Sequence, residues 1–406
     1  MKKTCLALAV VTLLVVLAVA GPASARTSTK ANTPVKIGII SDLTGQEATT
    51  GTLMVKSVKL AFAAIGNKIN GHPVQIVVGD GQDSAATAVD VAKKMVTSDK
   101  VCAIFGPNEV GEKMAVAGYM AQAQMPMILW SPMPMAPPML ANQWVIGAGG
   151  STAGCPTVMA DYIAHTLKYK TIATMSQDGS GGHAFIDPLV ATFKSFGGTV
   201  VGQQWTPVPT SDFASYVAGV PSADALVAWE AGSDAIKMLN SWYQSGKYKT
   251  MKLAAAFHGA FMDPWVFRAL NPKAAKALAG TPTPMEYAPD RTSAANKVFV
   301  KLCKNKKFGF GRAPEDGSYS NGYQAALGFI QALKGNGVNT DPTAIKTAML
   351  AARWTGPEGL EYFASGTHAA VKSFYIVDKK PNANGKGYHY HTLKMYANVP
   401  YQGWGH

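Results

Sequence analysis

Cysteine is scarce in this chain, with four residues among 406, and one of them, Cys5, lies near the N-terminus. The other three, Cys102, Cys155 and Cys303, allow one disulfide at most and match no zinc-ligand spacing, which excludes a disulfide scaffold and a zinc finger. Cys102 lies in an apolar strand pattern and Cys303 in a helical one, so we expect buried free thiols.

Charged residues are also few, at 15%, and no arginine-rich stripe alternates with aromatic residues. The formal net charge of +13 falls to +11 without Lys2 and Lys3, and the other lysines are scattered. This pattern is typical of a solvated surface, and we expect no nucleic-acid partner. Beyond residue 25, no apolar run reaches the roughly 20 residues that span a membrane.

The N-terminus carries the one long apolar run, in MKKTCLALAVVTLLVVLAVAGPASA. Two lysines, the apolar run and the Ala23-Ser24-Ala25 site predict a secretory signal peptide over 1–25. A membrane anchor would need a longer run and no cleavage site. Because Cys5 precedes the run, no lipidation site follows it. We therefore expect the mature chain free in a bacterial periplasm.

Buried strands alternate with amphipathic helices along the rest of the chain. VKIGIIS at 35–41 is a β-branched run, and helices are expected over 84–97, 110–123 and 185–196. This alternation predicts parallel sheets covered on both faces, the α/β class.

The alternation starts a second time after residue 151, and long helices follow over 318–334 and 341–352. About 380 mature residues in two such units indicate two lobes. Parallel sheets bind ligands at the carboxyl ends of their strands, so facing sheets would place a binding cleft between the lobes.

Several stretches, in order and over nearly the whole mature chain, resemble the type I periplasmic solute-binding proteins of ABC importers. The resemblance is to the branch that handles branched-chain amino acids, amides and aromatic acids. The stretches are VKIGIISDLTGQEATTG, VKSVKLAFAAIGNKINGHPVQIVVGD, IFGPNEVG, PMILWSPMPMAPPML, DALVAWEAGSDAIKMLNSWYQSG, NGYQAALGFIQALK and WTGPEG.

The resemblance implies two Rossmann-like lobes joined by a multi-strand hinge, the type I periplasmic-binding fold. We expect one lobe over 34–151 plus about 283–355 and the other over 152–282 plus about 356–406. It also implies a small-molecule ligand, a membrane permease as partner, a monomeric chain and no cofactor.

The resemblance also implies where the ligand binds. The segment after the G-P of IFGP, which binds a ligand carboxylate in the family, is Asn108 and Glu109 here, and the expected serine is missing. The family's small-residue loop corresponds to Met133, Pro134 and Met135. The family's acidic partner of an ammonium group falls near His258, and a tyrosine of the glycine-rich loop falls near Ser180.

An α-amino acid needs an anion for its ammonium group and donors for its carboxylate, because buried unpaired charges are costly. The matched positions carry methionines instead, so we expect an apolar or aromatic ligand with one polar or acidic end. The residues expected around this ligand are Thr50, Asn108, Glu109, Trp130, Ser131, Met133, Met135, Ser180, His183, Trp229, Glu230, His258 and Tyr319.

Other interpretations of the same residues remain open. The methionines of 125–140 also suit core filler, or Cu(I) ligation by thioethers. His389 and His391 share one strand face and suit either a metal edge or a solvated strand. Glu109 either contacts the ligand or favours a helix N-terminus, and with Glu230 it suggests acid–base chemistry.

The nucleophile-elbow, P-loop and H-E-x-x-H motifs are missing, so we expect no enzyme. The function predicted is hinge closure of a periplasmic receptor on a small organic molecule for an ABC importer. The alternatives are a sensory or delivery protein, and a branched-chain amino-acid binder with a rearranged site.

Overall fold

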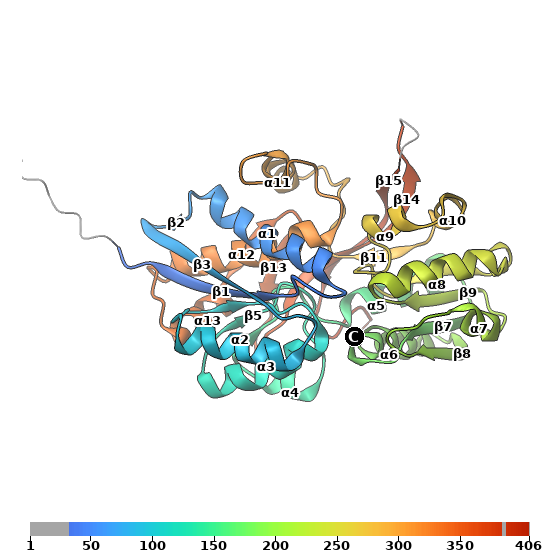
Figure 1. The fold of residues 1–406 in the computed structure, drawn as a ribbon, viewed down its shortest axis with the longest axis horizontal. Helices are drawn as coiled ribbons and strands as arrows, with labels where there is room; N and C mark the ends of the chain where they lie inside the picture. The colour runs from blue at the N-terminus through green and yellow to red at the C-terminus, as the bar shows by residue number, and fades with distance from the viewer. Residues whose placement is uncertain (1–31, 384–386, 406) are drawn as a thin grey trace, which may run out of the picture. The chain divides into compact units, whose positions relative to one another are not determined.

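The computed structural model describes residues 32–383 and 387–405, drawn as a coloured ribbon in Figure 1. The predicted signal peptide at 1–25 lies outside these residues. Helices and strands alternate along the chain, as predicted for an α/β protein. Within the described ranges, no helix combines the length and the apolar character needed to cross a bilayer.

The first sheet has six strands in the order β2-β3-β1-β4-β5-β6, and every neighbouring pair except β2 with β3 is parallel. The run VKIGIIS forms its central strand and is almost entirely buried, because helices cover both faces. The strands are β1 (Val35–Ser41), β2 (Lys68–Ile69), β3 (His72–Asp80), β4 (Ile104–Phe105), β5 (Met127–Ile128) and β6 (Val145–Ile146).

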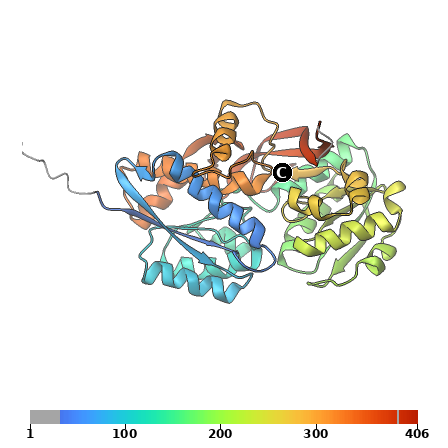
Figure 2. The same ribbon diagram turned by 45° about the horizontal axis from the view of Figure 1, so that its top comes forward.

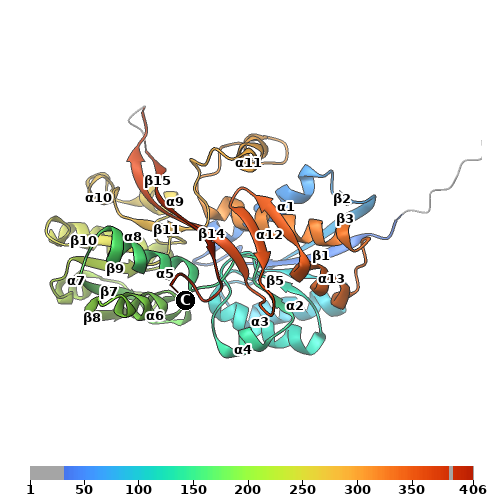
Figure 3. The same cartoon turned by 180° about the vertical axis from the view of Figure 1, so that it is seen from behind.

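Helices flank this sheet on both faces, with α1 and α12 on one face and α2 and α3 on the other (Figures 1 and 3). The helices predicted over 84–97 and 110–123 are confirmed as α2 and α3. The helices of this part are α1 (Ala48–Ala64), α2 (Ala85–Thr97), α3 (Val110–Ala123), α4 (Pro137–Ala141), α11 (Ala294–Lys304), α12 (Gly317–Gly335) and α13 (Pro342–Ala351).

The second sheet has four parallel strands in the order β10-β9-β7-β8. Its strands are β7 (Thr171–Gln177), β8 (Thr199–Thr206), β9 (Ala225–Trp229) and β10 (Lys252–Ala255). Figure 2 shows it from a second angle with its helices. They are α5 (Gly154–Asp161) continued by the π-turn η1 (Tyr162–Thr166), α6 (Ser180–Ser195), α7 (Ala214–Gly219), α8 (Gly232–Gln244), the 3₁₀ turn η2 (Lys247–Lys249), α9 (Pro264–Ala269) and α10 (Pro272–Leu278).

Helix α6 begins at Ser180, five residues before the predicted start at 185. The stretch SGGH, expected as a loop, is its first turn. A Cβ on Gly182 would lie 2.0 Å from the carbonyl oxygen of Gln177. The glycines therefore let the helix begin directly against the end of β7.

A third, antiparallel sheet collects the late strands, which Figure 3 shows from behind. Its order is β11-β14-β13-β12, and β15 pairs with β14. The strands are β11 (Thr283–Met285), β12 (Arg353–Gly356), β13 (Gly359–Phe363), β14 (Ala370–Pro381) and β15 (Tyr388–Val399).

Buried apolar side chains form two large clusters, one around each parallel sheet. Strand β14 contributes Ala370 to the first cluster and Phe374 and Ile376 to the second. Phe363 packs in the first cluster. The division into two lobes, with the late boundary at about 356, stays a prediction.

Candidate ligand-binding site

A cavity lies where loops and helix starts after the carboxyl ends of the parallel strands converge, the place that α/β sheets use for ligands. It contains about 590 Å³ of empty space, counted to its open side. This figure includes open solvent, and the enclosed space that water-sized spheres can enter is about 70 Å³, because the walls lie close together.

The first wall comes from the first sheet. Glu47 and Thr50 line the cavity from the start of α1, and Asn108, Glu109 and Lys113 line it from the start of α3. Because both helices begin just after buried strands, their first turns are held at one edge of the sheet.

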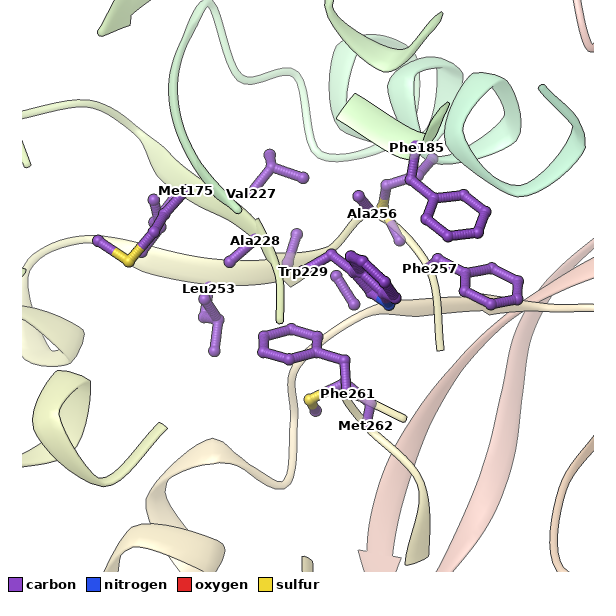
Figure 4. Packing of buried hydrophobic residues seen from close by; sticks show 14 of the residues in the cluster. Met175, Phe185, Val227, Ala228, Trp229, Leu253, Ala256, Phe257, Phe261 and Met262 are labelled. Atoms are coloured by element: carbon purple, nitrogen blue, oxygen red, sulfur yellow. The ribbon is translucent and has the colours of Figure 1, made fainter. Parts of the chain in front are cut away.

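The second wall is aromatic and comes mostly from the second sheet. Phe185 of α6 stacks on Phe257, with ring centroids 4.3 Å apart and an angle of 10° between the planes (Figure 4). Trp229, at the end of β9, meets Phe185 edge-on at 5.0 Å. The Trp229 indole N–H donates to the carbonyl of Gly259 at 2.9 Å, which orients its ring. Such faces suit a flat apolar group.

Lys113 is the cation of the first wall. Its side chain comes from the second turn of α3 and the residue is 2% exposed. The Nζ donates to the carbonyl of Pro132 at 2.9 Å, its one hydrogen-bond partner among the described residues. Burial lowers the pKa of Lys113 to about 8, although Glu109 and Glu286 oppose this shift. An ammonium has three donors, so this one can still bind an anion.

Two carboxyl groups line the same wall. Glu109 caps α3 and accepts from the backbone N–H groups of Gly111 at 2.5 Å and Glu112 at 3.1 Å. The helix-terminus interpretation of Glu109 is thus confirmed, and the side chain also lines the cavity. Glu47 has a single side-chain partner among the described residues, the amide of Asn108, whose Nδ2 lies 3.4 Å from Oε2.

Burial, and then the neighbouring carboxylates of Asp263 and Asp83, raise the pKa of Glu47 to about 8. Near it, Asp42 and Glu112 are buried, and burial together with the charge of Asp42 raises the pKa of Glu112 to about 9. This edge of the sheet is therefore rich in carboxyl groups that hold protons at neutral pH.

His258 is held on both sides by carboxylates. Its Nδ1 lies 3.2 Å from Asp263 and its Nε2 lies 2.7 Å from Glu286. Burial lowers its pKa, but Glu286 and Asp263 outweigh this and raise it to about 10. Because both ring nitrogens are occupied, His258 forms part of the wall as a fixed imidazolium. In this geometry neither ring nitrogen has a hydrogen left for a ligand.

The structure brings six of the expected residues to this cavity. They are Thr50, Asn108, Glu109, Ser131, Trp229 and His258.

The methionine-rich stretch 125–140 is largely core. Met133 is 1% exposed and packs in a buried cluster with Met127 and Met139, and Trp130 is fully buried below Gly106. Neither Trp130 nor Met133 lines the cavity, because β5 is only two residues long and the chain after it turns inward. The core-filler interpretation of these residues matches their placement.

Met135, Ser180 and His183 line a different cavity, beside α6. His183 is exposed, stacks on Trp205 at 3.9 Å and contacts Asp178 and Asp187. These three residues are therefore not part of the first cavity's lining.

Glu230 and Tyr319 also lie outside the cavity lining. Glu230 is fully buried and accepts from the hydroxyl of Thr206 at 2.9 Å, and burial raises its pKa to about 8. Tyr319 is 1% exposed and packs on Phe310. An acid–base pair of Glu109 and Glu230 across the cavity is therefore not formed.

The lining residues that sequence reasoning missed include Glu47, Lys113, Phe185 and Phe257. Only Lys113 left a signal, because it lies four residues after Glu109 and so shares its helix face. The aromatic residues lie in segments that the sequence predicts to be ordinary core. Their contact with one another arises only in the tertiary structure.

In the described ranges, no group of three or more His, Cys, Asp or Glu side chains has a geometry that suits a metal ion. His389 contacts Asn382 and His391 contacts Asp378, so the two imidazoles have separate partners. Cys102, Cys155 and Cys303 are free, as predicted, with Cys155 and Cys303 buried.

The fold and this cavity define a two-sheet solute receptor, and comparison with known proteins agrees. The chain belongs to the family described as Periplasmic binding protein, whose model matches residues 34–386. The type I periplasmic-binding fold predicted from the sequence is thereby confirmed. The family consists of solute-binding proteins rather than enzymes.

Three similar proteins illustrate the relationship. Leu/Ile/Val-binding protein homolog 6 of Brucella melitensis is 23% identical over 80% of this chain and 82% of that relative. An ABC transporter substrate-binding protein from Sphaerobacter thermophilus superimposes with a TM-score of 0.81, at 21% identity, over 90% of this chain and 99% of that one.

The third is an R. palustris solute-binding protein in complex with 4-hydroxybenzoate, with a TM-score of 0.79 and 22% identity over 92% of this chain and 99% of that one. Some other curated Leu/Ile/Val-binding relatives are matched over only about half of their length.

Proposed function

We propose that this protein is a periplasmic receptor that binds a small aromatic or otherwise apolar organic acid and delivers it to an ABC importer. The observation that carries the proposal is Lys113, a buried ammonium with unused donors in a cavity whose other wall is Phe185, Phe257 and Trp229. The flat ring of the ligand packs on the aromatic wall, and the ligand's carboxylate binds the ammonium group of Lys113. The R. palustris receptor's complex with 4-hydroxybenzoate supports this ligand class.

Hinge closure is the proposed mechanism. The cavity takes residues from both parallel-sheet units, so the full set of ligand contacts exists only when both walls are in place. A ligand that contacts both walls stabilises that arrangement and shifts the population toward it. The Gln46 amide donates to the carbonyl of Ala231 at 2.9 Å, a contact between the segments before α1 and α8 that supports this proposal.

The same proposal includes export to the periplasm with cleavage after Ala25, a monomeric state and a permease partner. Native mass spectrometry of the purified mature chain tests two of these points. We expect the mass of a single chain beginning at residue 26, with a small organic acid retained.

Calorimetry with benzoate, phenylacetate and leucine tests the ligand class. We expect benzoate-type acids to bind with micromolar or tighter Kd and leucine at least about 100-fold more weakly, a difference of about 2.7 kcal/mol. Tight leucine binding without binding of any aromatic acid would overturn the ligand class in favour of a branched-chain amino-acid receptor.

A further inference from the structure

Glu47 lines the cavity in a way that the aromatic-acid proposal leaves unused. It precedes α1 and is half-buried, and its side chain makes no capping hydrogen bond to that helix. Among the described residues its carboxyl group has one partner, the Asn108 amide, which donates to Oε2. The second oxygen, Oε1, has no protein partner and belongs to a side chain on the cavity wall.

The surroundings of Glu47 decide its protonation state. Four carboxylates raise its pKa: Asp42 after β1, Asp83 before α2, Glu109 before α3 and Asp263 before α9; the Lys113 ammonium on the same wall acts in the opposite direction. No basic side chain forms an ion pair with it within the described residues. Burial beside like charges favours the neutral acid, and the pKa of Glu47 is raised to about 8.

A neutral carboxyl group has one O–H donor in addition to its acceptor sites. In the contact with Asn108 the amide NH₂ group is the donor, so this contact supplies no acceptor for that hydrogen. A ligand group that enters the cavity can supply the acceptor that this donor lacks within the described part of the protein.

We propose that Glu47 is a specificity-determining residue that hydrogen-bonds a second, uncharged polar group of the ligand, such as a ring hydroxyl. The inference rests on the proposed function, because Lys113 is taken to bind the carboxylate. The favoured class is therefore a hydroxylated aromatic acid. The competing occupant is a cationic group, which would require ionised Glu47.

Calorimetry at pH 7 with benzoate, 3-hydroxybenzoate, 4-hydroxybenzoate and 4-(aminomethyl)benzoate tests this role. For the natural chain we expect the better hydroxybenzoate to bind about tenfold more tightly than benzoate, the effect of one good hydrogen bond. Glu47→Ala should reduce this ratio to within about twofold.

Glu47→Gln keeps a donor and an acceptor of the same shape, so it should retain most of the ratio. Thr49→Ala is the matched control, because Thr49 lies on the first turn of α1, is exposed and is not part of the lining. It should leave the ratio unchanged. The Glu47 variants should fold, since they remove no helix cap.

An unchanged ratio in Glu47→Ala would overturn the role of Glu47, and so would tightest binding of 4-(aminomethyl)benzoate by the natural chain. Benzoate binding without any hydroxyl preference would refute only this inference. Failure of every benzoate to bind would instead refute the proposed function.

Discussion

At the scale of single residues, the site depends on groups whose charge is set by their surroundings. Among the described residues, the buried ammonium of Lys113 has one hydrogen-bond acceptor, and the carboxyl group of Glu47 has one hydrogen-bond donor. Burial disfavours the charged form of each, so the pKa of Lys113 is lowered to about 8 and that of Glu47 is raised to about 8.

Ligand affinity should therefore fall above about pH 8. As the pH rises through the pKa of Lys113, the free protein loses the proton that a bound carboxylate requires. Glu47 ionises in the same range and repels that carboxylate, so both groups act in the same direction. Calorimetry between pH 6 and about 10 should show a flatter decline in Glu47→Gln than in the natural chain. Affinity that rises with pH would contradict both assignments.

Lys113→Met should weaken benzoate by about 10–100-fold, because a charge-assisted hydrogen bond is replaced by a thioether of similar length. The exposed Lys59→Met on α1 is the control and should change the Kd little. Equal Kd values for the natural chain and Lys113→Met would show that the carboxylate binds elsewhere.

At the scale of elements, the helices that begin at the cavity are held by close packing behind it. Helix α12 crosses α1 at Gly322, where a Cβ would lie 2.8 Å from the carbonyl oxygen of Met54 and 3.0 Å from the backbone nitrogen of Val58. Both helices also present residues to the cavity, Thr50 from α1 and Asn321 from α12. This backbone approach therefore sets the position of two parts of the wall.

Gly322→Ala should lower the free energy of unfolding by about 1–3 kcal/mol, because a backbone atom cannot move aside for the new methyl group. Gly335→Ala, on the same helix, is the matched control: nothing lies within 4 Å of its Cβ position. That change should raise stability by up to about 1 kcal/mol through helix propensity. Urea unfolding measures both, and a stabilised Gly322→Ala would refute the packing argument.

At the scale of the whole described chain, one strand serves both hydrophobic clusters. Lys372 lies on β14 between the residues that this strand adds to the first cluster and those that it adds to the second. The residue is 1% exposed, and its Nζ lies 2.6 Å from Glu358 and 3.0 Å from Glu361. Burial lowers the pKa of Lys372, but Glu358 and Glu361 outweigh this and hold it well above its ordinary value. The charges thus compensate one another where the chain passes from one core to the other.

Lys372→Met should cost about 3–5 kcal/mol of stability, because it leaves buried carboxylate without its counter-charge. Lys380→Met breaks an ion pair with Asp378 whose lysine side chain is 49% exposed, and should cost less than about 1 kcal/mol. Chemical unfolding of both variants makes the comparison. Similar small losses would mean that the Lys372 cluster contributes nothing beyond a surface pair.

The sequence by itself determined the α/β class, most helix positions and the family resemblance, because strand and helix periodicities are local and buried strands read as apolar runs. It also located the loops after β4 and β5, and hence Asn108, Glu109 and Ser131. The prediction that Met133 and Met135 line the cavity is not supported by their placement. Apolar residues after a strand look alike in the sequence whether they face a cavity or the core.

Only the tertiary structure decided which side chains meet. Phe185 and Phe257 lie 72 positions apart in the sequence yet stack at 4.3 Å, and the two carboxylates that hold His258 come from separate segments. Burial and neighbouring charges also set the protonation of Lys113 and Glu47, and these arise only after folding. The chemistry of the cavity is therefore a product of long-range packing, whereas the fold that carries it follows from local pattern.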